Sequence, residues 1–149
     1  MEIWYFRRKG EKIMGKVTKY KFGICAHSGI QEKGINYWET YTPVVQWMSV
    51  KIMLKLAAIE NLHTKSIDFV LVYLQANLDV DIYMELPQGF NVVPECGRYV
   101  LKLQNNLYGL NQAGQNWFEK LSSALGNLSI NPRKVDPCVF IREDVIVLV

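Results

Sequence analysis

Residues 66–76 read SIDFVLVYLQA, and the organisation of the whole chain follows from this stretch. It places one carboxylate, Asp68, inside an apolar run, and an aromatic residue, Tyr73, five positions later. Burial of a carboxylate is costly unless a metal ion or another cation compensates it. Asp68 is therefore a candidate functional residue. The alternative is an aspartate at the end of a strand, where it caps the following turn.

Four further motifs flank this stretch in a fixed order. They are TPVV at 42–45, YMELPQGF at 83–90, LYGLNQA at 107–113 and DPCVF at 136–140. Several ordered motifs are far more specific than any one of them. Together with Asp68 they resemble the reverse transcriptase domain of copia-type LTR retrotransposons, and the resemblance covers nearly the whole chain.

The resemblance implies an α+β fold, a fragment of reverse transcriptase fingers and palm with antiparallel strands packed with two main helices. Residues 1–45 would form a fingers-like basic hairpin and residues 46–149 an incomplete palm and fingers. In the family the strand at 145–149 leads into a Tyr-x-Asp-Asp turn with two more catalytic aspartates. We therefore expect the 149 residues to be truncated before the second catalytic hairpin and inactive alone.

The resemblance also implies a two-metal site for nucleotidyl transfer from a dNTP to a primer end. Asp68 would be the catalytic carboxylate that binds both Mg²⁺ ions, and the backbone carbonyl of Phe69 would bind the nucleotide metal. Lys21, Tyr73 and Gln112 would contact the nucleotide, with the Tyr73 ring under the sugar. The expected partners are an RNA or DNA template-primer, dNTPs and the remainder of a retrotransposon polyprotein.

Two cations of the family pattern are absent from this chain. The family block Tyr-Lys-Ala-Arg-Leu corresponds to YKFGI at 20–24, so that Gly23 replaces an arginine. The lysine of the family's Leu-Lys-Gln is Asn111. Both changes remove a cation from the predicted phosphate-binding region, and an arginine supplies a fork of donors that no neutral residue replaces.

The charge of the chain is uneven. The formal net charge is +3, yet residues 1–21 alone contain seven Lys and Arg against two Glu. We expect Arg7, Arg8 and Lys9 to contact nucleic acid, with the interleaved aromatic residues packing or stacking on bases. A solvated basic hairpin without a ligand explains the charge equally well.

Local patterns predict the elements. The expected elements are a β-hairpin of residues 4–8 and 20–26, a helix at Trp47–Ile59, a strand carrying Asp68, a hairpin of residues 83–90 and 99–103, a helix at 111–128 capped by Asn111, a turn at Asn131–Pro132, and paired strands at 139–141 and 145–149. The first helix carries only Lys51 and Lys55 as charges, so we expect it to be buried on most sides beneath the strand of Asp68. Asp79, Asp81 and Glu85 are expected to face water.

The sequence shows no apolar span of membrane length and no secretory signal, so we expect a cytoplasmic protein. Its three cysteines, Cys25, Cys96 and Cys138, are an odd number without Cys-x-x-Cys spacing and are interpreted as reduced thiols. Two other hypotheses stay open at this point. The chain could be a non-catalytic nucleic-acid-binding remnant, or a decayed retroelement fragment without a stable fold.

Overall fold

The structure is a computed structural model that describes residues 2–10, 17–89 and 99–149. Cys96 and the rest of residues 90–98, which connect the two strands of the second predicted hairpin, lie outside these residues. The elements are β1 (Glu2–Gly10), β2 (Val17–Ala26), η1 (Ser28–Ile30), α1 (Trp47–Ile59), α2 (Val72–Gln75), β3 (Tyr83–Glu85), β4 (Val100–Lys102), α3 (Ala113–Asn127), β5 (Asn131–Pro132), β6 (Val139–Arg142) and β7 (Val145–Leu148).

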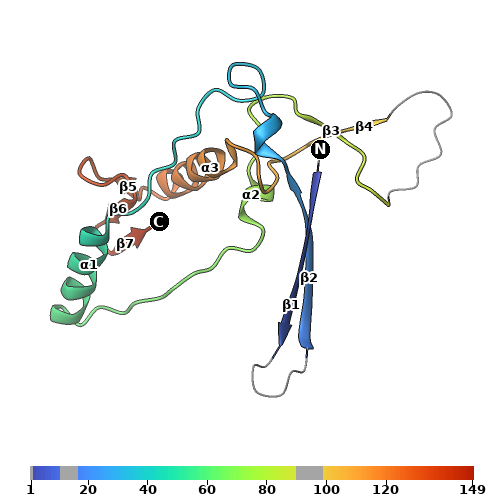
Figure 1. Cartoon of the computed structure of the whole chain (residues 1–149). Helices are drawn as coiled ribbons and strands as arrows, with labels where there is room; N and C mark the ends of the chain where they lie inside the picture. The colour runs from blue at the N-terminus through green and yellow to red at the C-terminus, as the bar shows by residue number, and fades with distance from the viewer. Residues whose placement is uncertain (1, 11–16, 90–98) are drawn as a thin grey trace.

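The strands form three separate antiparallel sheets, with the orders β1-β2, β3-β4 and β5-β6-β7. The hairpin of β1 and β2 is long and runs away from the rest of the chain, whereas α3 lies near the C-terminal sheet (Figure 1). The predicted mixture of helices and antiparallel strands is confirmed. The predicted pairings within all three hairpins are confirmed as well, because β1 pairs with β2, β3 with β4 and β6 with β7.

Two small cores hold these elements together. The first centres on Ile82, Leu110 and Ala113, with Tyr73 and Ala26 among the partly buried residues packed against it. The second lies between α3 and the C-terminal sheet, where the ring of Phe118 contacts the fully buried ring of Phe140 at a centroid distance of 6.4 Å. Helix α3 contributes to both cores, so it is the central support of the described chain.

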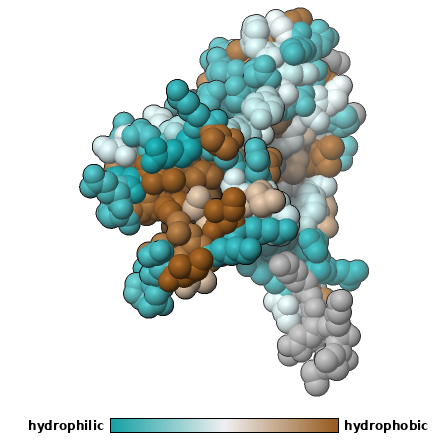
Figure 2. Space-filling model, turned by 90° about the vertical axis from the view of Figure 1, so that its left-hand side faces the viewer, coloured by the Kyte–Doolittle hydropathy of each residue, from teal (hydrophilic) through white to brown (hydrophobic). Residues whose placement is uncertain are grey.

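The bounds predicted for α1 are confirmed, but its predicted burial is wrong. None of its residues is buried, and Trp47 and Ile59 at its two ends are 71% and 78% exposed. The apolar side chains of α1 point to most sides of the helix, all except that of Lys51 and Lys55, so its sequence selects no single face for packing. Figure 2 shows the side of the molecule on which α1 lies, where hydrophobic side chains gather in one area.

The predicted strand at Asp68 is wrong. Residues 62–69 form an extended connection without regular secondary structure between α1 and α2 (Figure 1), and Asp68 is exposed rather than buried. A strand needs a neighbour that pairs with its backbone. No backbone pairing of residues 63–69 occurs within the described part of the chain.

Two details near α3 also differ from expectation. The N-cap of α3 is Gln112, and the predicted cap Asn111 instead donates its side-chain amide to the carbonyl of Ser28 at 3.2 Å. Asn131 and Pro132, predicted as a turn, form the short edge strand β5 beside β6. Proline is compatible with an edge because a missing N–H breaks no ladder bond there.

Candidate functional site

The segment at 107–113 is the point at which distant parts of the chain meet. The amide of Ala26, at the end of β2, donates to the carbonyl of Tyr108 at 2.7 Å. Gly109 follows with φ of +91°, and a Cβ atom there would lie 2.1 Å from the carbonyl oxygen of Ala26. Only glycine permits both this left-handed backbone and this close approach. The base of the hairpin is therefore fixed directly to the entry of α3.

Gln112 is fully buried at the same entry, and both polar atoms of its side chain are bonded. Its Oε1 accepts from Nε2 of Gln31 at 3.1 Å, and its Nε2 donates to the carbonyl of Asn36 at 3.0 Å. Gln31 in turn accepts from the amide of Asn111 at 2.8 Å. In this arrangement Gln112 holds residues 31–36 against α3, and its contact with a nucleotide stays a prediction.

Tyr73 lies on α2 and is half-buried. Its ring contacts Tyr108 edge to face at a centroid distance of 4.8 Å. Asn106, which follows β4, is 1% exposed and donates its side-chain amide to two carbonyls just after α2, those of Ala76 at 3.2 Å and Asn77 at 2.7 Å. Tyr73 thus lies against the 107–113 segment, which itself contains Gln112, another predicted nucleotide contact. Asn106 was missed because an asparagine outside a motif gives no sequence signal.

Asp68 and Phe69 lie on the connection that leads into α2. The ring of Phe69 contacts Trp117 of α3 edge to face, with centroids 5.2 Å apart. Asp68 makes no hydrogen bond or ion pair with other described residues. Leu71 closes the connection with φ of +54°, which is strained for a leucine. The connection is therefore held to α3 beside Asp68, while the carboxylate itself is open to solvent.

The described residues do not provide the donor set for two Mg²⁺ ions. No group of three His, Cys, Asp or Glu side chains gathers anywhere in 2–10, 17–89 or 99–149. Asp68 offers one carboxylate, and two divalent cations need several. The acids Asp79, Asp81 and Glu85 face water as predicted. Asp81 pairs with Lys102 at 2.7 Å, and this hydrogen bond raises the pKa of Lys102.

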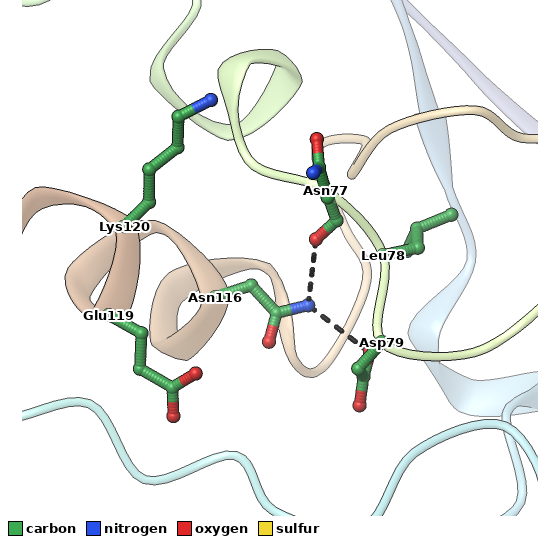
Figure 3. Close-up of a pocket in the computed structure, with 6 residues that line it drawn as sticks. All are labelled: Asn77, Leu78, Asp79, Asn116, Glu119 and Lys120. Atoms are coloured by element: carbon green, nitrogen blue, oxygen red, sulfur yellow. Dashed lines mark hydrogen bonds between the residues drawn. The ribbon is translucent and has the colours of Figure 1, made fainter. Parts of the chain in front are cut away.

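A polar hollow lies between α3 and the chain that follows α2 (Figure 3). It is lined by Asn77, Leu78, Asp79, Asn116, Glu119 and Lys120. The amide of Asn116 donates to the carbonyl of Asn77 at 3.4 Å and to Oδ1 of Asp79 at 3.2 Å, and Lys120 donates to the carbonyl of Gln75. These hydrogen bonds hold the chain at the end of α2 to α3, and they thereby fix the helix that carries Tyr73.

The predicted nucleic-acid contacts lie together on the hairpin. Arg7 is opposite Lys21, Arg8 is opposite Tyr20, and Lys9 is opposite Lys19. Arg7, Arg8 and Lys21 are exposed and make no ion pair with other residues in the described part of the chain. The structure therefore gathers the predicted cations on one hairpin, separate from the extended connection that carries Asp68 (Figure 1).

Asp136 is a buried carboxylate that the sequence did not single out. It is 3% exposed, and Oδ2 accepts from the hydroxyl of Ser49 at 2.6 Å and from the amide of Gln46 at 3.0 Å. Oδ1 accepts from the amide of Cys138 at 3.0 Å. These donors, the Ser49 hydroxyl above all, lower the pKa of Asp136. The carboxylate joins the N-terminus of α1 to the C-terminal sheet.

The comparison with known proteins decides the family. Residues 1–149 match the family described as "Reverse transcriptase (RNA-dependent DNA polymerase)". The chain belongs to this reverse transcriptase family. The family predicted from the sequence is thereby confirmed. Its copia type is confirmed as well, because the related proteins are Pol polyproteins of such transposons.

Three relatives show the extent of the similarity. The chain is 34% identical over 93% of its length to the "Retrovirus-related Pol polyprotein from transposon TNT 1-94" of Nicotiana tabacum, and covers 10% of that protein. It is 31% identical over 94% of its length to the corresponding polyprotein from transposon RE1 of Arabidopsis thaliana, covering 9% of it. For the "Transposon Ty1-BL Gag-Pol polyprotein" of Saccharomyces cerevisiae the identity is 28% over 66% of the chain and 5% of the relative.

This reverse transcriptase chain therefore spans about a tenth of the length of the plant polyproteins it matches. No solved structure matches it significantly.

Within the described ranges, no helix combines the length and apolar composition that crossing a membrane requires. Cys25 and Cys138 are free thiols, and burial raises the pKa of Cys138.

Proposed function

We propose that this chain is part of an RNA-directed DNA polymerase, to which it supplies the catalytic carboxylate of Asp68. The observation that carries the proposal is the family match over the whole chain. The exposed position of Asp68 supports it further, because a carboxylate without a protein partner is free to bind a metal ion. The alternative of a non-catalytic remnant has no comparable support.

Residues 1–45 would form the fingers part and residues 46–149 the palm part of this domain. The hairpin supports this division because it is a sheet of its own, joined to the remainder at the Ala26–Tyr108 hydrogen bond. Arg7, Arg8 and Lys9 would contact the template-primer. Arg7 and Arg8 are exposed and form no ion pair with other described residues, which suits contact with phosphates.

The nucleotide would lie near the entry of α3. Lys21 would contact its phosphates, Tyr73 would support its sugar, and Gln112 would line the pocket. The contact of Tyr73 with Tyr108 fixes the Tyr73 ring, and the two hydrogen bonds of Gln112 fix the loop beside it. The Phe69 carbonyl would bind the metal that accompanies the nucleotide.

Divalent metal ions supply the charge stabilisation in nucleotidyl transfer. We propose that this chain contributes Asp68 to that site and that the other carboxylates come from elsewhere in a complete polymerase domain. As part of a Pol polyprotein, the domain would work with the remainder of that polyprotein in a cytoplasmic particle. Alone, the 149 residues would not extend a primer.

Complementation tests this proposal. The chain would be assayed for primer extension with Mg²⁺ and dNTPs, alone and joined to the segment that follows the matched region in the tobacco relative. We expect extension only from the joined protein, and Asp68→Asn should lower its rate by at least about 100-fold, since it removes a metal ligand. Glu60→Gln, which changes an exposed acid at the end of α1, is the matched control and should retain the rate.

Two results would contradict the proposal. Extension by the joined protein that survives Asp68→Asn would show that Asp68 is not catalytic. Template-dependent extension by the 149-residue chain alone, lost on Asp68→Asn, would show that its own residues complete the metal site.

A further inference from the structure

The register of β1 and β2 separates four of the five aromatic residues of the hairpin, all except Tyr5, from most of its cations. Directly opposed residues of an antiparallel pair share a face, and the face alternates along each strand. Arg7 and Lys21 therefore share one face, with Lys19 two residues from Lys21. Phe6 and Phe22 are opposed on the other face, beside the pair of Arg8 and Tyr20. The order of residues in the sequence suggests one interleaved surface, whereas the register makes two different ones.

The second face, the aromatic face, consists of Phe6, Arg8, Tyr20 and Phe22. The two phenylalanines are 74% and 76% exposed and Tyr20 is 70% exposed. Trp4 extends this face, since its ring stacks on Phe6 with an interplanar angle of 20° and centroids 6.1 Å apart. An open hollow is lined by the four residues of the aromatic face together with Arg7 and Lys21.

The charge of the hairpin selects the occupant of this face. Residues 3–8 and 17–26 contain four Lys or Arg and no acidic residue. Arg7 and Lys21 are directly opposed like charges, an arrangement that an anion stabilises. A second copy of the same hairpin would add more positive charge and be repelled. A polyanion that also carries flat apolar rings satisfies both the cations and the exposed aromatic rings.

We infer that the aromatic face binds unpaired bases of single-stranded nucleic acid by stacking, with Arg8 and the cations of the other face meeting the phosphates. The inference rests on the proposed function, because it names the strand that the hairpin contacts. Bases in a duplex are stacked on one another and offer no free ring face, so the hairpin should prefer single strands. Any base has a ring face, so no strong sequence preference is expected.

The test compares two ligands for the 149-residue chain by fluorescence anisotropy. One is a labelled single-stranded RNA of about 12 nucleotides, a length within the usual site size, and the other is an RNA–DNA hybrid of equal length. The double variant Phe6→Ala and Phe22→Ala should weaken single-strand binding by about 10-fold or more, because stacking contributes that much per base. The affinity for the hybrid should change less than about twofold in this variant, and the salt dependence of that affinity should stay nearly the same.

Two control variants separate the possible explanations. Ile59→Ala removes a hydrophobic side chain of similar exposure from α1 and should change neither affinity. The double variant Arg7→Gln and Lys21→Gln should weaken the binding of both ligands and reduce the salt dependence of each affinity, because it removes phosphate contacts. Since all these positions are exposed, thermal unfolding should stay cooperative in each variant and verify that it is folded.

Several outcomes would overturn the inference. Equal loss of single-strand and hybrid binding in the phenylalanine variant would show that the face does not select bases. Self-association that this variant abolishes would show that a second copy covers the face. If neither ligand binds in a salt-dependent way, the proposed template contact fails as well. If only the single-strand preference is missing, the inference fails and the proposed function stands.

Discussion

Two aspartates of this chain have opposite surroundings. Asp136 is 3% exposed and accepts hydrogen bonds from Ser49, Gln46 and Cys138. Asp68 is exposed and has no partner within the described ranges. A buried carboxylate needs several donors, and once it has them it serves the fold. Asp68, in contrast, is open to solvent and is not occupied by a described protein partner.

The same contrast holds for the regions around the two residues. Asn106, Gln112 and Asp136 are the buried polar residues of the described chain, and each bonds to a segment distant in sequence. Around Asp68, in contrast, Ile67 and Val70 are 76% and 73% exposed. Stability should therefore depend on the first region, and substitutions of the exposed side chains of Ile67, Asp68 and Val70 should leave it nearly unchanged.

The largest effect is expected for Gly109→Ala. The new methyl group would lie 2.1 Å from the Ala26 carbonyl oxygen, in a backbone with φ of +91°. The hairpin base would have to move, and we expect the melting temperature to fall by about 10 °C, from a clash and strain of a few kcal/mol. Circular dichroism measures this change.

Gly34→Ala is the matched control for that substitution. Gly34 also has a positive φ, +85°, but no atom lies within 4 Å of an added Cβ. Backbone strain alone should lower the melting temperature by about 3 °C. Equal effects of the two substitutions would show that the contact between Gly109 and Ala26 does not hold the hairpin.

Asp136→Ala should have the next largest effect. It leaves the Ser49 hydroxyl and two amides without their acceptor, and α1 loses its connection to the C-terminal sheet. We expect the melting temperature to fall by about 6 °C. Proteolysis within α1 should become faster, because this exposed helix buries none of its residues. Unchanged proteolysis would mean that other contacts hold α1.

The pH dependence of stability tests the same carboxylate. The pKa of Asp136 in the folded chain is lowered from its ordinary value of 3.8, so the unfolded chain binds the proton more readily. Its stabilisation is complete above that value and is lost as the pH falls through the lower folded pKa. Asp136→Asn should therefore flatten the acid side of the stability curve measured by urea unfolding. A curve as steep as that of the unsubstituted chain would exclude this role.

Local signals in the sequence predicted the elements well. The bounds of α1 and the pairing of the hairpins agree with the structure, because helix composition, turn residues and alternation act over a few neighbouring residues. The burial of α1 and a strand at Asp68 were predicted wrongly. Both require a partner element, and nothing within residues 47–71 specifies one.

The site divides in the same way. The order of the motifs along the chain is sufficient to predict the family and to single out Asp68 and Gln112. Asp136 lies in one of those motifs, yet its role depends on Gln46, which is 90 positions away in the chain. The separation of aromatic and basic faces depends on the register of β1 and β2. Composition alone cannot supply either fact.

The smallest effect on stability is expected for Asp68→Ala. The side chain is exposed and no hydrogen bond or ion pair to it occurs in the described ranges, so the melting temperature should change by less than about 1 °C. The same substitution should abolish extension by the joined protein. This combination separates a catalytic residue from a structural one. A fall as large as that of Asp136→Ala would instead mean that Asp68 is buried in the folded protein, and the contrast between the two aspartates would be wrong.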